Sequence, residues 1–212
     1  MNKISIIFLS LFLSVSAAFS QDELAQQILN ELSEQGNSYE DITAEFSFNF
    51  NNNSQGIDEY SEGKIWIKED MYKLDISSDL SIINNGETLW YFMKDVPEVQ
   101  IMESDPEDEM NPSKIFTIYE RGYKYQYKGE SNEKGKDLHI INLYPESSGT
   151  ISKVVLYVYS EETKIYKIQL NDKDGGVSSY IINSFIINNK VPESMFNFRK
   201  KDHPGVEVID LR

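Results

Sequence analysis

Apolar and polar residues alternate with two different periods along the chain. Over residues 21–35 the apolar positions are spaced by three and four, which places them on one face of an amphipathic helix. These positions are Leu24, Ala25, Ile28, Leu29 and Leu32. Gly36 follows them and is expected to end the helix, because glycine readily adopts the left-handed conformation found at helix C-termini. From residue 39 onward the period is close to two, as in a half-buried β-strand.

Most of the remaining chain is predicted to form short strands joined by tight turns. The predicted strands cover residues 44–50, 64–68, 72–76, 82–83, 89–92, 99–101, 123–127, 138–143, 154–159, 165–170, 177–187, 195–198 and 206–209. Asn84-Asn85-Gly86 and Asp174-Gly175-Gly176 are typical of hairpin turns. Residues 111–120 are predicted to form a short helix or an ordered loop, with Pro112 in the first turn. The pattern therefore predicts a mainly β fold, an antiparallel sheet of about 11 strands that curls, with helical pieces over one face.

The first twenty residues have the layout of a secretory signal peptide. Lys3 precedes an apolar run over residues 4–15, and Ala18-Phe19-Ser20 offers small residues for cleavage before Gln21. The apolar run is shorter than the roughly 20 residues that a membrane-spanning helix needs. We therefore expect residues 1–20 to be removed and residues 21–212 to form a single exported domain.

The composition excludes several classes of protein. The chain of 212 residues has no Cys, which excludes disulfide frameworks, thiol nucleophiles, Fe–S clusters and a Cys-attached lipid anchor. Its net charge of −15 makes it a poor nucleic-acid binder, because phosphate contacts need a basic surface. The 13 Tyr and 11 Phe residues nevertheless supply enough apolar area for a core.

The polar side chains form no recognisable catalytic or metal-binding pattern. His139 and His203 have no metal-ligand spacing around them and are interpreted as structural or surface residues. Asp172-x-Asp174-Gly175 lacks the rest of a calcium loop and is interpreted as a turn. The acidic stretch 103–109 is interpreted as a solvated loop. We therefore predict that the protein is not an enzyme and has no catalytic residues, metal or cofactor.

One series of apolar positions on the predicted strands shares a single face of the sheet. Its members are Phe46, Phe48, Phe50, Ile65, Ile67, Tyr72, Leu74, Ile76, Leu89 and Tyr91. Periodicity alone favours an ordinary sheet core covered by the helix at 21–35, since most such faces are simply core. The other interpretation is a cavity for an apolar ligand, because two short helices leave room inside a wide curved sheet. The pattern leaves both interpretations open.

Several short motifs follow one another in an order that is more specific than any one of them. They are Tyr39-x-x-Ile42-x-Ala44-x-Phe46, Gly63-Lys64-Ile65-Trp66-Ile67-Lys68, Ile83-Asn84-Asn85-Gly86-Glu87-Thr88-Leu89-Trp90-Tyr91, Ser178-Ser179-Tyr180, Phe196-x-Phe198 and Pro204-Gly205-Val206-Glu207-Val208-Ile209-Asp210. With these motifs the chain resembles the family of periplasmic outer-membrane lipoprotein carriers of the LolA type. The resemblance covers nearly all of residues 21–212.

The resemblance implies a fold and an activity. Members have an unclosed antiparallel β-barrel with helices that form a lid over an apolar concave face. They take acylated lipoproteins from an inner-membrane ABC-type lipoprotein-releasing complex, shield the acyl chains, and deliver them to the outer membrane. An outer-membrane receptor is a further implied partner. We therefore expect a monomeric periplasmic carrier that binds no nucleic acid.

The resemblance also implies which residues face the lipid. The implied lipid-binding residues are the strand series above together with Ile115 and Phe116, and the implied lid residues are Leu24, Ile28, Leu32 and Tyr119. One departure is Glu69. Many members have an Arg near this position that holds the lid closed through hydrogen bonds, and Glu69 cannot donate them. Lys68 and Lys73 are candidates to replace it, and Tyr72 adds a hydroxyl where the family is usually apolar.

Other roles are compatible with this resemblance. The same fold class includes periplasmic regulators that sense stray lipoproteins and bind a regulatory protein partner. A further alternative is an envelope module that binds a lipid, a glycolipid or a polypeptide. The lipid-anchored outer-membrane receptor of lipoproteins is disfavoured because the chain has no Cys, and an exported hydrolase is disfavoured because no catalytic constellation is recognisable.

Overall fold

The computed structural model describes residues 5–105, 111–120 and 122–212, without the side chains of residues 5–20, 115–117 and 119. Its elements are α1 (Ser5–Ser38), β1 (Ile42–Asn52), β2 (Ile57–Lys68), β3 (Met71–Ile76), β4 (Leu80–Asn84), β5 (Thr88–Met93), β6 (Glu98–Glu103), the 3₁₀ helix η1 (Pro112–Glu120), β7 (Tyr123–Glu133), β8 (Lys136–Pro145), β9 (Ile151–Tyr159), β10 (Ile165–Asp172), β11 (Val177–Ile187), the 3₁₀ helices η2 (Glu193–Phe196) and η3 (Lys200–Asp202), and β12 (Glu207–Asp210).

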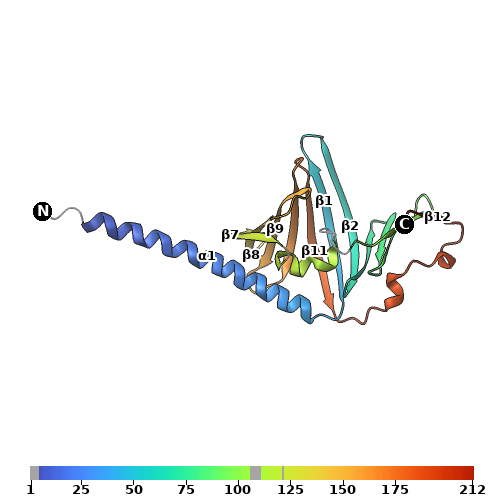
Figure 1. Ribbon diagram of the computed structural model, residues 1–212, viewed down its shortest axis with the longest axis horizontal. Helices are drawn as coiled ribbons and strands as arrows, with labels where there is room; N and C mark the ends of the chain where they lie inside the picture. The colour runs from blue at the N-terminus through green and yellow to red at the C-terminus, as the bar shows by residue number, and fades with distance from the viewer. Residues whose placement is uncertain (1–4, 106–110, 121) are drawn as a thin grey trace.

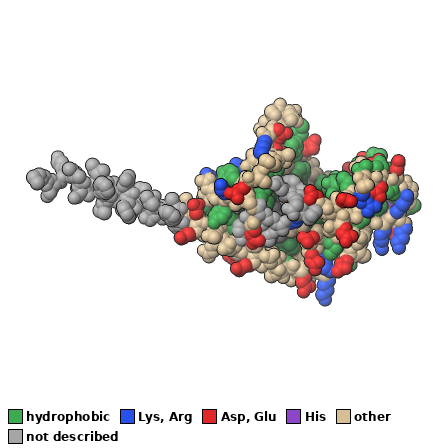
Figure 2. Space-filling view, in the orientation of Figure 1, with side chains coloured by type: hydrophobic (Ala, Val, Ile, Leu, Met, Phe, Trp, Pro, Cys, Tyr) green, Lys and Arg blue, Asp and Glu red, His purple; other side chains and the backbone are tan. Residues whose placement is uncertain are grey.

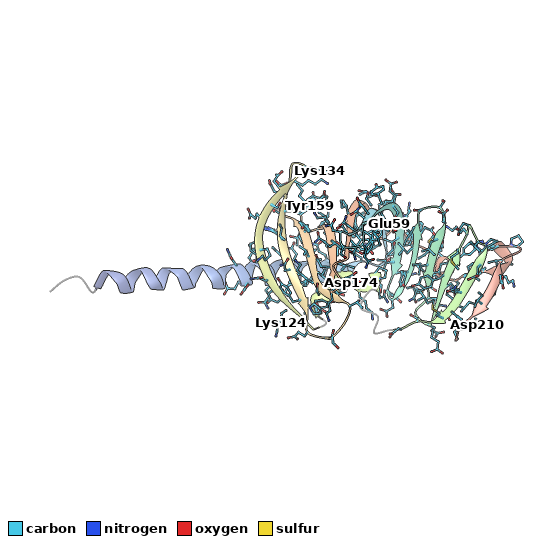
Figure 3. The ribbon with its side chains drawn as sticks, turned by 90° about the horizontal axis from the view of Figure 1, so that it is seen from above. Glu59, Lys124, Lys134, Tyr159, Asp174 and Asp210 are labelled. Atoms are coloured by element: carbon cyan, nitrogen blue, oxygen red, sulfur yellow. The ribbon has the colours of Figure 1, made fainter. Side chains whose placement is uncertain are left out.

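All twelve strands belong to one sheet that curls without closing. The strand order is β12-β6-β5-β4-β3-β2-β1-β11-β10-β9-β8-β7, so β12 and β7 are its two edges. Every neighbouring pair is antiparallel except β12 and β6, which are parallel. Figures 1 and 3 show α1 beneath the half of the sheet that contains β7–β10. The predicted mainly β fold, with an unclosed sheet partly covered by helix, is confirmed.

The two predicted hairpin turns are present. Between β4 and β5 the Asn85 amide donates to the Thr88 carbonyl at 3.2 Å, and Gly86 has a φ of +91°. Between β10 and β11 the Asp172 amide donates to the Gly176 carbonyl at 2.8 Å. Glycine tolerates the positive φ that such turns require. The Asp172 segment is therefore a turn, as predicted.

One predicted helix end and one predicted strand are wrong. Helix α1 begins at Ser5 and ends at Ser38, so Gly36 is part of the helix instead of following it. The Ser38 hydroxyl donates to the Gln35 carbonyl at 2.7 Å and so satisfies one of the last open backbone groups of the helix. The strand predicted at 195–198 is also wrong, because residues Glu193–Phe196 form η2 after Pro192, whose φ is −75°.

The apolar interior of the sheet is divided between two clusters. In the first, Ala25, Ile28, Leu29 and Leu32 of α1 pack against buried residues of β7–β10. The second cluster is formed by strands alone, from Ile42, Ala44, Phe46, Ile65, Ile67 and Tyr72 on β1, β2 and β3. Helix α1 therefore covers only one half of the concave face.

A third, smaller cluster holds the C-terminal segment against β5 and β6. Phe92, Val99 and Val206 are buried there. The His203 ring stacks on Phe198 at 5.0 Å and lies 4.5 Å from the Phe92 ring, centroid to centroid. His203 therefore has a structural position between two aromatic rings. The other histidine, His139, shares a 2.8 Å hydrogen bond between its Nδ1 and the Tyr127 hydroxyl.

Within residues 5–105, 111–120 and 122–212, no helix, α1 included, is long and apolar enough to cross a membrane. In Figure 1 the N-terminal half of α1 extends away from the sheet, and the C-terminal half packs on it.

Replacing Leu29 with alanine should destabilise the protein strongly. Leu29 is 1% exposed between α1 and the sheet, and removal of a buried leucine side chain typically costs about 2–5 kcal/mol of unfolding free energy. Urea unfolding followed by circular dichroism would measure the change. Gln27→Ala, on the exposed face of the same helix, should change the stability by less than about 0.5 kcal/mol. Equal effects of the two variants would contradict the packing of α1.

Candidate functional site

A cavity of about 700 Å³ lies on the concave face, next to the half that α1 covers, and Leu32 and Gln35 of α1 are part of its lining. Ligand sites usually have volumes of about 300–1,000 Å³. One wall comes from β1–β5 and consists of Ile42, Ala44, Phe46, Ile65, Ile67, Tyr72, Leu74, Ile76, Ile82 and Tyr91. The other wall comes from β10 and β11 and includes Ile165, Ile168, Leu170, Tyr180, Ile182 and Phe185. The remaining apolar lining residues are Leu32, Pro112 and Ile118. The polar lining residues, together called the rim, are Gln35, Tyr39, Asn111, Lys114, Tyr123, Ser147, Tyr159, Thr163, Lys164, Asn183 and Ser184.

Most residues of the predicted strand series line this cavity. Those in the lining are Phe46, Ile65, Ile67, Tyr72, Leu74, Ile76 and Tyr91. Three members of the series lie outside it. Phe48 packs its ring against Tyr180 at 4.9 Å, Phe50 lies over Gly176 at the end of the sheet, and Leu89 packs against the second cluster.

The predicted lid residues divide between core and cavity. Leu32 lines the cavity. Ile28 and Leu24, which lie one and two helical turns before it on α1, pack instead into the first cluster. Ile115, Phe116 and Tyr119 belong to η1, but their side chains lie outside the described part of the structure.

The wall from β10 and β11 was not among the predicted site residues. Strand β1 pairs with β11 from the far end of the chain, with Phe46 opposite Ile182 and Phe48 opposite Tyr180. Alternation over 177–187 predicts the strand, but it does not reveal which strand lies beside it. The pairing places Tyr180 and Ile182 on the same face as the predicted series and so completes the cavity.

A close approach between β1 and β2 makes room for the Phe46 ring. Phe46 lies opposite Gly63, and a Cβ atom at Gly63 would overlap the Phe46 Cζ atom. Because of this overlap, a glycine at position 63 leaves the room that the Phe46 ring needs. The motif residue Gly63 is thus explained by packing inside the cavity.

Helix η1 bridges the two halves of the molecule. It contacts α1 and β7 on one side and β2 and β3 on the other. It follows Asn111, a buried residue whose side-chain oxygen accepts from the Ser113 amide at 3.0 Å and from the Ser113 hydroxyl at 2.8 Å. We call η1 and residues 24–38 of α1 the lid. The Ser33 hydroxyl donates to the Glu120 carboxylate at 2.5 Å and joins the two parts of the lid.

Neither lysine that could replace the family's Arg hydrogen-bonds to the lid in the described structure. Lys68 forms an ion pair of 3.3 Å with Glu193 of η2. Lys73 pairs with Asp75 at 3.4 Å, and its Nζ lies 5.2 Å from the centre of the Trp66 ring. A polar contact that is described within the lid is the Ser33–Glu120 hydrogen bond, which joins α1 to η1.

The rim of the cavity is polar although its walls are apolar. The Tyr39 hydroxyl donates to the Gln35 side-chain oxygen at 3.2 Å. Burial raises the pKa of Tyr39, and the nearby Lys164 ammonium partly opposes this change. Lys164 forms an ion pair of 2.7 Å with Glu162, which lowers the pKa of Glu162 and raises that of Lys164. An apolar interior with a polar rim suits the binding of an amphiphile.

The described residues show no arrangement suited to metal chemistry. Over residues 5–105, 111–120 and 122–212, no group of three His, Asp or Glu side chains is placed to hold a metal ion. The apolar side chains of the cavity can contact hydrocarbon, and the tyrosine hydroxyls can form hydrogen bonds. The lining can therefore contact a ligand that has both apolar and polar parts.

Comparisons with known proteins agree with this geometry. A family model described as "Outer membrane lipoprotein carrier protein LolA" matches residues 37–199. No curated protein matches the chain significantly.

Similar solved structures include an uncharacterized conserved protein from Thermus thermophilus, at 10% identity and a TM-score of 0.57, covering 88% of this chain and 98% of that one. A LolA superfamily protein from Nitrosomonas europaea has 15% identity, a TM-score of 0.44, and coverage of 82% and 97%. The lipoprotein LppX from Mycobacterium tuberculosis has 10% identity, a TM-score of 0.49, and coverage of 79% and 98%. At these identities the first likeness shows the fold alone.

The family match extends from the last turn of α1 to the segment between η2 and η3, and so includes all the strands that line the cavity. It also includes the lid helix η1. Because the match covers most of the chain, the protein belongs to the LolA family of outer-membrane lipoprotein carrier proteins.

Proposed function

We propose that the protein is a periplasmic carrier that binds the acyl chains of lipoproteins in its cavity and shuttles them from the inner to the outer membrane. The observation that supports this most is the cavity of about 700 Å³, lined by aliphatic and aromatic side chains, on the concave face of a LolA-family sheet. Carriers of this family are binding proteins and not enzymes. The specific shuttle role extends beyond the family membership.

The energetics of acyl chains explain why a carrier is needed. Exposure of a chain to water costs about 0.8 kcal/mol per methylene group, so a triacylated anchor with about 40 methylenes would cost about 30 kcal/mol. This exceeds the roughly 20 kcal/mol at which non-covalent affinities saturate. The relevant equilibrium is therefore between membrane and cavity, and the cavity must bind its load loosely enough to release it.

The volume of the cavity limits what it holds with the lid in its present position. A cavity of about 700 Å³ lies within the range of about 300–1,000 Å³ that is usual for the site of one small ligand. A triacylated anchor is larger. We infer that the lid moves outward when a lipoprotein is loaded, so that further space opens between η1 and the strands.

The lid is built in a way that allows this movement. Helix η1 is a 3₁₀ helix of 9 residues that rests on both halves of the molecule. 3₁₀ helices have poorer hydrogen-bond geometry than α-helices, and segments with few buried contacts open at a low free-energy cost. Opening at η1 would remove Ile118 from the first cluster but leave the packing of α1 on β7–β10 in place.

The proposed location is the periplasm, where LolA-family proteins act. The predicted signal peptide, residues 1–20, precedes all the described side chains of α1 that pack in the core, since the first of these is Leu24. Cleavage before Gln21 would therefore leave these contacts intact. The proposed partners are acylated lipoproteins, the inner-membrane ABC-type lipoprotein-releasing complex and an outer-membrane receptor.

The surface charge fits a carrier that acts as a monomer. Asp and Glu side chains are spread over much of the face in Figure 2, while Lys and Arg gather at the end away from α1. The net charge of the chain is −15. Like-charge repulsion keeps proteins soluble and apart, which would protect an apolar cavity from self-association.

The central test is the identity of the molecules bound in the cell. The protein would be purified from the periplasm without detergent, and co-purifying material would be identified by mass spectrometry. Acylated lipoproteins are the expected result. Recovery of a lipid or glycolipid without any acylated protein would contradict the shuttle and favour a lipid-sensing module, and recovery of only water-soluble ligands would exclude both.

Replacing Leu74 with glutamate should abolish lipoprotein loading. Leu74 lines the cavity, and an ionised carboxylate beside an acyl chain cannot be solvated, so bound lipoprotein should decrease by about tenfold or more. Co-purification from the periplasm measures this. The control Gln126→Glu adds the same charge at an exposed position of β7 and should load normally. Normal loading by Leu74→Glu would exclude the cavity as the binding site.

Replacing Ser33 with alanine should loosen the lid. The variant loses the hydrogen bond to Glu120 that joins α1 to η1, and a partly exposed bond to a charged acceptor is worth about 1 kcal/mol. Amide hydrogen exchange over residues 112–120 should then be about fivefold faster. Ser152→Ala removes an exposed hydroxyl bonded to the Asn171 carbonyl on β10 and should leave exchange in η1 unchanged. Unaltered exchange in Ser33→Ala would mean that this bond does not hold the lid.

A further inference from the structure

Tyr180 occupies a special place among the tyrosines of the cavity. It lies on β11, opposite Phe48 of β1 and Ile168 of β10, and it packs against both the helix-covered cluster and the strand-only cluster. Its ring is held by Phe46 and Phe48, with centroid distances of 5.9 and 4.9 Å. The side chain is therefore fixed where the two walls of the cavity meet.

The hydroxyl of Tyr180 differs from those at the rim. The Tyr39 hydroxyl donates to Gln35, and the Tyr159 hydroxyl accepts a bond of 2.8 Å from Lys136. The Tyr180 hydroxyl forms no hydrogen bond with any described residue, although Tyr180 is one of the residues that line the cavity. The hydroxyl is not sealed inside the protein, since the described buried side-chain atoms without a hydrogen-bond partner are Thr43 Oγ1 and Ser160 Oγ. A ligand that enters the cavity can therefore reach it and accept its hydrogen bond.

The Tyr180 hydroxyl is a donor at neutral pH. Burial raises its pKa above the ordinary tyrosine value, and the nearby Asp172 carboxylate raises it further. Both effects disfavour the phenolate, so the group stays protonated and neutral. Its natural partner is an uncharged acceptor oxygen, because the negative field of Asp172 disfavours an anionic one.

The walls below Tyr180 are apolar. Along β1, the distance from Phe48, opposite Tyr180, to Ile42 at the other end of the cavity spans six residues, or about 20 Å of strand. Phe46, Ala44 and Ile42 line that path from the β1 side, and Ile65 and Ile67 from the β2 side. A long hydrocarbon tail can lie along this path with its polar end at Tyr180.

We propose that the Tyr180 hydroxyl donates a hydrogen bond to the carbonyl oxygen that links an acyl chain to its head, so that the cavity selects acyl esters and amides over alkyl chains. The inference rests on the proposed function, because it requires that the cavity binds such chains. It adds a defined hydrogen-bond donor, the Tyr180 hydroxyl, for the polar linkage of the ligand. A lipoprotein anchor contains both ester and amide linkages of this kind.

A matched pair of ligands tests this selection. The probes are a 1-acyl lysophosphatidylcholine and the 1-O-alkyl lysophosphatidylcholine of the same chain length, which differ only in the carbonyl group. Dissociation constants would be measured by isothermal titration below the critical micelle concentration. The wild-type protein is expected to bind the acyl probe about 3- to 10-fold more tightly, which is the value of one neutral hydrogen bond.

Variants assign the preference to Tyr180. Tyr180→Phe keeps the ring, and should weaken binding of the acyl probe by the same factor of about 3 to 10 while leaving the alkyl probe unchanged. Tyr60→Phe makes the same change at an exposed residue outside the cavity, and should retain the full preference. Thermal unfolding would check that both variants fold.

The outcomes separate this inference from the proposed function. Equal affinities of the wild type for both probes, or a preference that survives in Tyr180→Phe, would overturn the role of Tyr180 while leaving an acyl-binding cavity in place. Failure of the wild type to bind either probe would contradict the cavity's role in binding acyl chains, and this inference with it.

Discussion

The sheet is much wider than a single helix, and the rest of the structure depends on this difference in width. Twelve strands spaced by about 4.8 Å extend over roughly 50 Å, whereas a helix with its side chains is about 10–12 Å across. Helix α1 therefore covers only the half of the concave face formed by β7–β10. The half formed by β1–β3 has its own apolar cluster, to which α1 contributes no residue. The cavity arises because α1 covers less area than the concave face of the sheet offers.

The position of helix η1 follows from the same difference in width. It contacts α1 and β7 but also β2 and β3, so it crosses from the filled half to the open half. The 3₁₀ helix has 9 residues, and Pro112, Lys114 and Ile118 of this helix line the cavity. Helix η1 therefore forms part of the cavity lining between the two halves of the sheet.

The sequence predicted the fold better than the site. Period-two alternation is a local signal, so the strands from 44 to 187 were found, and 177–187 was found with its observed limits. The strand at 195–198 failed because Phe196 and Phe198 fit a period of two although the segment follows Pro192 and has no strand beside it. The wall formed by β10 and β11 was missed because it depends on the pairing of Phe46 with Ile182, which no local pattern reports. The covering of Ile28 by strands, instead of exposure to the cavity, is likewise a result of tertiary packing.

Gly63 has a consequence for the wall of the cavity. The Phe46 ring lies close to the Gly63 backbone, and a Cβ atom at position 63 would overlap the Phe46 Cζ atom and lie 2.9 Å from the Asp75 carbonyl oxygen. An alanine there would therefore force either the Phe46 side chain or the backbone of the neighbouring strand to shift. Because Phe46 lines the cavity, a residue without a side chain helps to determine the shape of the cavity wall.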